Sequence, residues 1–125
     1  MSLISYIAIA YGVACVGVIG FQLALIAGAP LGPLTQGGKH KGALPPAGRI
    51  AAFVSIFVIA AMACGVMSAA GLWPQWPNWT KWVALTVQSL VAVLNWITPS
   101  KPERALWGPL ESVMLVLAAL VVFSA

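Results

Sequence analysis

Long apolar stretches alternate with short polar segments along this chain. Residues 3–27 and 50–71 contain no charged side chain, and residues 79–97 and 103–124 form two further, largely apolar stretches. An α-helix needs about 20 such residues to cross a hydrocarbon core that is roughly 30 Å thick. The pattern therefore predicts an all-α membrane protein, a single domain over residues 1–125 with four transmembrane helices in an up-down bundle.

A polar segment that is rich in glycine and proline, residues 28–49, separates the first two stretches. Glycine and proline at this density do not continue a helix, and irregular backbone exposed to lipid leaves its amides unpaired. We expect this segment at the membrane surface or folded back against the bundle. Residues 32–40 superficially resemble a phosphate-binding loop, but they follow a membrane helix instead of a strand, and no Ser or Thr follows Lys39. Nucleotide binding is not predicted.

Tryptophan recurs at every third position between the second and third stretches, at Trp73, Trp76, Trp79 and Trp82. Tryptophan prefers the headgroup level of a bilayer, so we interpret these residues as an interfacial belt. The alternative interpretation is an aromatic box that binds a ligand.

The start of the last helix has two interpretations. Ser100 and Glu103 have the spacing of a capping box, which predicts a helix that begins at the surface and is kinked at Pro109. In the alternative, the helix begins near Gly108, with Pro109 in its first turn and Glu111 at its amino end. We favour the first interpretation.

Composition supports the membrane assignment, because 62% of the residues are hydrophobic and only 6% are charged. A soluble domain carries about 25% charged residues. The formal net charge is +4, but the basic residues form no dense patch, so the expected partner is the lipid bilayer and not nucleic acid. Cys15 and Cys64 lie in apolar stretches and are interpreted as small buried hydrophobes. No metal site and no cofactor are predicted.

Basic residues are distributed unevenly among the connecting segments. Segment 28–49 contains Lys39, Lys41 and Arg49, segment 98–107 contains Lys101 and Arg104, and the tryptophan-rich connection contains only Lys81. The positive-inside rule therefore places segments 28–49 and 98–107 in the cytoplasm, with both termini on the opposite side of the membrane.

A few polar residues lie inside the predicted spans. Glu111 is a carboxylate within the last span, and such a residue is by default a candidate for function. Gln88 and Asn95 are seven residues apart, so they share one face of their helix. Together with Gln22, these residues are our candidates for a polar binding site.

A structural role is the alternative for the acidic residues. Ion pairs between Glu103 or Glu111 and the basic residues Arg49 or Arg104 would hold the glycine-rich loop against the last helix. The positive amino end of a helix would also favour a carboxylate in its first turn.

Two sequence elements together resemble a group of small uncharacterised bacterial four-helix integral membrane proteins. The first is Gly28-Ala-Pro-Leu-Gly, with Gly37-Gly38 and Gly42-Ala-Leu-Pro after it, and the second is the PERxxWGP motif before the last helix. The likeness covers most of the chain, including the order of the loops. It implies a multi-pass protein of the bacterial inner membrane, and it carries no activity with it.

We expect a non-enzymatic protein that acts through helix packing, as a homo-oligomer or as an accessory subunit of a larger membrane complex. Small residues at four-residue spacing, Ala61, Gly65 and Ala69, support this expectation because they let helices approach closely. The alternative is an oligomeric transporter or channel for a small solute or ion. A lipid-modifying enzyme is less favoured, because the chain shows no nucleophile with a base, metal cluster or paired carboxylates.

Overall fold

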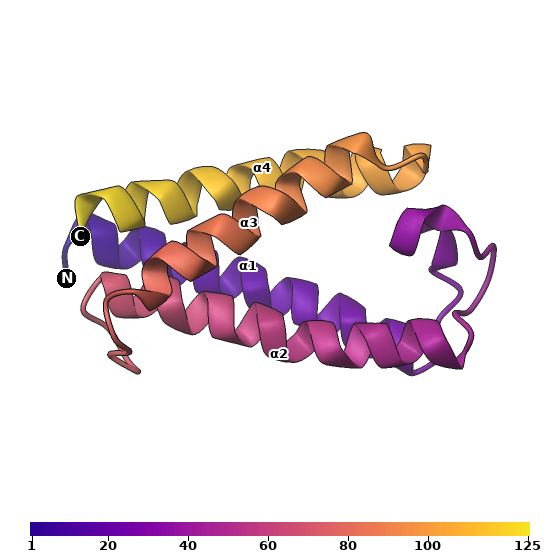
Figure 1. Ribbon diagram of the computed structural model, residues 1–125, viewed down its shortest axis with the longest axis horizontal. Helices are drawn as coiled ribbons and strands as arrows, with labels where there is room; N and C mark the ends of the chain where they lie inside the picture. The colour runs from indigo at the N-terminus through magenta and orange to yellow at the C-terminus, as the bar shows by residue number, and fades with distance from the viewer.

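The fold of this chain contains only helices and turns (Figure 1). A computed structural model describes all 125 residues. It contains helices α1 (Leu3–Ile26), α2 (Pro46–Ala69), α3 (Thr80–Ile97) and α4 (Lys101–Ser124), with short 3-10 helices η1 (Gly32–Leu34) and η2 (Gln36–Gly38) between α1 and α2. Three of the helices, α1, α2 and α4, are long and apolar enough to cross a membrane. The predicted all-helical fold is therefore confirmed, and the three candidate spans fit a multi-pass membrane protein.

Successive helices run in opposite directions along the long axis, and both chain ends lie at the same end of the molecule (Figure 1). Helix α1 packs most extensively against α2, and α3 packs most extensively against α4. The two helix pairs lie close together at the end that carries the termini. They separate toward the other end, where loop 1, residues 27–45, lies between them (Figure 1).

The structure settles where the second and last helices begin. Helix α2 starts at Pro46 instead of residue 50, because proline fits the first turn of a helix, where its missing N–H is not needed. Helix α4 starts at Lys101, with the Ser100 hydroxyl accepting a hydrogen bond from the Glu103 N–H at 3.3 Å. Pro109 lies inside α4. The interpretation that starts the last helix after the Ser100 cap, and not near Gly108, is confirmed.

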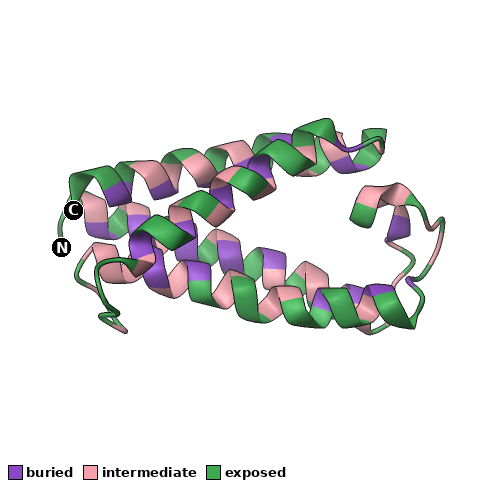
Figure 2. Ribbon diagram, in the orientation of Figure 1, coloured by how far each residue is buried: buried purple, intermediate pink, exposed green.

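Buried residues lie mainly where the helices face one another (Figure 2). The main core comprises Ala8, Tyr11, Cys15, Val18, Met62, Val66, Ala84, Met114, Ala118 and Val121. A smaller cluster of Leu25, Leu44 and Ala52 packs beneath loop 1. Many large apolar side chains, such as Phe53 and Phe57, remain exposed on the outer faces. Such extensive apolar surface fits contact with lipid.

Two glycines permit close contact between helices. A methyl group added at Gly65 of α2 would lie 3.1 Å from the Thr80 carbonyl oxygen and 3.3 Å from the Ala84 methyl of α3. A methyl group at Gly108 of α4 would lie 3.0 Å from the Trp96 indole of α3. Gly65 therefore packs within this chain, whereas the small-residue spacing alone allowed packing within one chain or between chains.

Replacing Gly108 by alanine should destabilise the fold, because the added methyl would press against the Trp96 ring. We expect Gly108→Ala to lower the free energy of unfolding by about 1 to 3 kcal/mol, the usual cost of overpacking. Thermal unfolding in a neutral detergent measures this loss.

Gly17→Ala on α1 is the matched control, since no atom lies within 4 Å of a methyl group added there. It should unfold at the wild-type temperature or above. Equal melting temperatures for Gly108→Ala and the wild type would contradict the proposed contact with Trp96.

Candidate functional site

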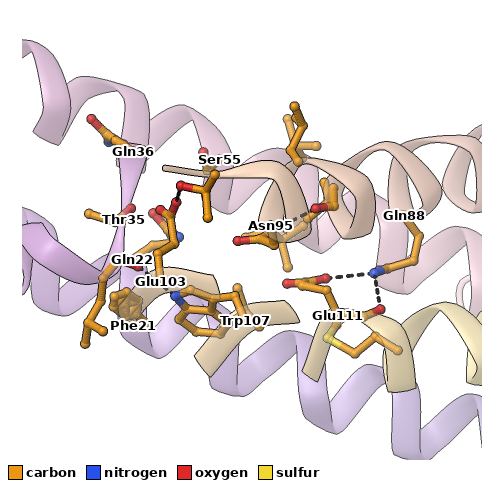
Figure 3. Close-up of a pocket in the computed structure, with 18 of the residues that line it drawn as sticks. Phe21, Gln22, Thr35, Gln36, Ser55, Gln88, Asn95, Glu103, Trp107 and Glu111 are labelled. Atoms are coloured by element: carbon orange, nitrogen blue, oxygen red, sulfur yellow. Dashed lines mark hydrogen bonds between the residues drawn. The ribbon is translucent and has the colours of Figure 1, made fainter. Parts of the chain in front are cut away.

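A cavity of about 660 Å³ lies between the two helix pairs, and all four helices and loop 1 contribute to its lining (Figure 3). Most of the lining is apolar, but several polar side chains interrupt it. The polar side chains labelled around the cavity in Figure 3 are Gln22, Thr35, Gln36, Ser55, Gln88, Asn95, Glu103 and Glu111. An apolar enclosure with a few placed polar groups is the usual form of a small-molecule binding site.

All four candidate binding residues line this cavity. Gln22 comes from α1, Gln88 and Asn95 from α3, and Glu111 from α4. Asn95 donates a hydrogen bond to the Val91 carbonyl of its own helix at 2.8 Å. The structure therefore brings together side chains that are far apart in the sequence, around one internal space.

A chain of hydrogen bonds connects three helices beside the cavity. The Tyr11 hydroxyl of α1 donates to Gln88 Oε1 at 2.8 Å. Gln88 Nε2 in turn donates to Glu111 Oε2 at 2.7 Å and to the Glu111 carbonyl at 3.2 Å. The Gln88 side chain is fully buried, so these bonds satisfy an amide that solvent does not reach.

Sequence reasoning identified Gln88 and Glu111 but missed Tyr11. Tyrosine in a membrane protein prefers the interface with water, where its hydroxyl is hydrated. Tyr11 instead lies well inside α1 and is fully buried. A tyrosine in the interior of an otherwise apolar span was the available signal, since its hydroxyl needs a partner there.

Glu103 and Ser100 attach loop 1 to the start of α4. The Glu103 carboxylate accepts hydrogen bonds from the Thr98 hydroxyl and, at 3.3 Å, from the Gly37 N–H. The Ser100 hydroxyl donates to the Pro33 carbonyl at 2.6 Å. The Glu103 carboxylate therefore binds loop 1. In a complete capping box it would instead accept a hydrogen bond from the Ser100 N–H.

Two further bonds hold the η1–η2 region of loop 1. Trp107 Nε1 donates to the Leu34 carbonyl, and Gln36 Nε2 donates to the Gly48 carbonyl of α2, at 2.8 Å and 2.9 Å respectively. Gly38 adopts a φ of +69°, and a methyl group there would lie 2.7 Å from Ser100. Residues 34–37 line the cavity, so loop 1 closes its end (Figure 3).

The arginines that we expected to pair with carboxylates have other partners. Arg49 Nε donates to the Leu44 carbonyl at 2.9 Å, and Arg104 donates to the Thr98 carbonyl at 3.2 Å. Successive residues on a helix point about 100° apart, so Arg104 does not face the same side as its neighbour Glu103. Hydrogen bonds from neutral groups, in place of ion pairs, thus hold loop 1 on α4.

Comparison with known protein families, curated proteins and solved structures found no match to this chain. The resemblance to small bacterial four-helix membrane proteins stays a prediction. What the chain does is therefore inferred from the cavity itself.

Removing the Tyr11 hydroxyl should weaken the fold, because Gln88 Oε1 would lose its buried donor. We expect Tyr11→Phe to lower the free energy of unfolding by about 1 to 3 kcal/mol. Tyr6→Phe is the control on the same helix, because Tyr6 is 59% exposed, and it should change stability by less than about 0.5 kcal/mol. Thermal unfolding of both variants in detergent measures the difference. An equal effect of the two substitutions would refute the role of Tyr11.

Loop 1 should open more often when the Trp107 indole N–H is removed. Trp107→Phe deletes one hydrogen bond, worth about 0.5 to 1.5 kcal/mol, so the open population should rise about two- to tenfold. The rate of trypsin cleavage after the exposed residues Lys39 and Lys41 reports that population.

Trp96→Phe is the matched control, because the Trp96 N–H donates to Ser112 of α4 and not to loop 1. Its cleavage rate in loop 1 should equal that of the wild type. Unchanged cleavage of Trp107→Phe would show that the bond to Leu34 does not hold the loop.

Proposed function

We propose that this chain is a four-span protein of the bacterial inner membrane, with loop 1 and the connection before α4 in the cytoplasm. Helix α3 is shorter than the three candidate spans, and its 18 residues include polar ones. Its polar residues Gln88 and Asn95 line the internal cavity, whereas Leu90 and Val93 do not line it and are exposed. An apolar outer face and a polar inner face allow α3 to lie in the bilayer beside α1, α2 and α4.

We infer that the protein is non-enzymatic and binds a small molecule in its cavity, as a carrier or transporter does. The observation that supports this most is the cavity of about 660 Å³ in a single chain, lined by Gln22, Gln88, Asn95 and Glu111. Glu103 and Glu111 are eight residues apart on α4, which corresponds to about 12 Å along the helix. That separation exceeds the range of paired-carboxylate catalysis, so the cavity is better suited to binding.

Assembly with other chains is a second candidate function, and the outer surface of α1 supports it. Gly17 and Gly20 are exposed, and no atom lies within 4 Å of a methyl group added at either position. Small exposed residues on a membrane helix allow the helix of another protein to approach closely. A homo-oligomer or an accessory subunit of a larger complex would use this surface.

Native mass spectrometry of the protein, extracted gently from its own membrane, tests the binding proposal. We expect one small molecule per chain. Ser55→Trp should abolish retention of that molecule, because Ser55 lines the cavity and the indole would fill part of it. Ala51→Trp, one turn earlier on α2 at an exposed residue that does not line the cavity, should retain it.

A wild-type chain without a bound molecule would overturn the binding proposal. If that chain also carried unrelated proteins at fixed stoichiometry, the accessory-subunit function would take its place. Retention by both tryptophan variants would place the molecule outside the cavity.

A further inference from the structure

The acidic and basic residues of this protein occupy different regions: the acidic ones line the cavity, and the basic ones lie outside it. Glu103 and Glu111 are its only acidic residues, and both line the cavity. None of the six lysines and arginines lines it, although the formal net charge of the chain is +4. The cavity is therefore lined by every acidic residue of the chain and by no basic one.

Neutral groups are the hydrogen-bond partners of both carboxylates. Glu111 accepts from the Gln88 amide, and Glu103 accepts from the Thr98 hydroxyl and the Gly37 N–H. Glu103 lies in the first turn of α4, where the positive amino end of the helix favours a carboxylate. For Glu111 the hydrogen bond from a neutral amide leaves the charge of the ionised form uncompensated, and this is costly in a low-dielectric interior. A positively charged ligand would supply the missing compensation.

The cavity reaches the surface of the bundle between α2 and α3. Val54 and Val58 of α2 and Leu94 and Ile97 of α3 line it, and each of these side chains is more than 40% exposed. All four residues are apolar and belong to helix stretches proposed to lie in the bilayer. The opening is therefore suited to a molecule that arrives from the lipid phase.

A second, smaller cavity of about 280 Å³ lies next to the first, along α2 and α3. Val58 and Met62 belong to the lining of both cavities. Trp76 and Trp79 of the tryptophan-rich connection also line the smaller one, whose other residues are almost all apolar. This space suits the hydrocarbon part of a ligand whose polar part lies in the larger cavity.

An inorganic cation fits this arrangement poorly. No group of three or more His, Cys, Asp or Glu side chains is close enough to hold a metal ion. The two carboxylates are separated by about two turns of α4, and the walls between them are largely apolar. An organic cation with an apolar body matches both the charge and the lining.

We propose that the cavity binds a lipophilic organic cation, such as an alkylamine or a quaternary alkylammonium, that enters from the bilayer between α2 and α3. Its charged group lies near Glu111, and its hydrocarbon part extends between α2 and α3 toward Trp76 and Trp79. This proposal rests on the proposed binding function and specifies its ligand.

Binding of three probes with the same decyl chain tests the proposal. The probes are decyltrimethylammonium, decyl sulfate and decanol, each radiolabelled and equilibrated by dialysis with the full chain in phosphatidylcholine nanodiscs. Partition into empty nanodiscs is subtracted. We expect one saturable site per chain for the cation, with binding of the anion and the alcohol weaker by about tenfold or more.

Glu111→Gln should weaken binding of decyltrimethylammonium about tenfold or more, because it removes the charge and preserves an acceptor for Gln88. Decanol binding should not change. Lys101→Gln is the control, since it also removes one charge from α4 but lies outside the cavity and is exposed. It should bind the cation as the wild type does.

The melting temperature of Glu111→Gln shows whether the variant is folded, and if it is not, the comparison of the three probes on the wild-type chain decides the proposal. Unchanged binding of the cation by a folded glutamine variant would overturn the proposal. Equal saturable binding of the three probes would also overturn it, while leaving the cavity as a binding site. A lack of saturable binding for every probe would overturn the binding function as well.

Discussion

The Gln88 amide is the interaction on which the interior of this bundle depends. In lipid no water replaces a missing hydrogen bond, so a fully buried amide needs partners from the protein. Tyr11 and Glu111 supply them from α1 and α4, and the amide thereby fixes how α3 sits between these helices. Apolar residues such as Ala84 and Met114 surround this network. Apolar contacts are non-directional, so they do not determine which polar groups pair. The same bonds place Glu111 at the edge of the cavity.

Loop 1 is the second element that determines the shape of the cavity. The helix pairs separate at this end, and an open end would expose backbone and polar side chains (Figure 1). The loop fills the gap because glycines let it turn sharply, with Gly37 and Gly38 at positive φ. Its carbonyls accept hydrogen bonds from Ser100 and Trp107. The glycine- and proline-rich composition is thus explained by close docking onto α4.

The position of the charges connects the fold to the proposed function. The basic residues lie in loop 1 or within the first four residues of α2, α3 or α4, and five of the six lie at the loop 1 end of the bundle. This distribution favours one orientation in the membrane. The two carboxylates occupy the interior, where only neutral protein groups accompany them. A cationic ligand could pair with a carboxylate in the cavity, because no lysine or arginine of the chain lines it.

Much of the architecture follows from the sequence, because lipid tolerates few kinds of structure. The apolar stretches indicate helices, and the Ser100 to Glu103 spacing marks the start of α4. The sequence also identified Gln22, Gln88, Asn95 and Glu111 as candidates for a binding site. A polar side chain in a membrane span is costly unless it has a partner or a function. It did not reveal the partner of each polar group. Tyr11, Gln88 and Glu111 lie on three different helices, and the turn of loop 1 directs Gly37 to Glu103. Only the tertiary structure decided these pairings, because helix rotation and loop docking depend on contacts between residues that are far apart in the chain.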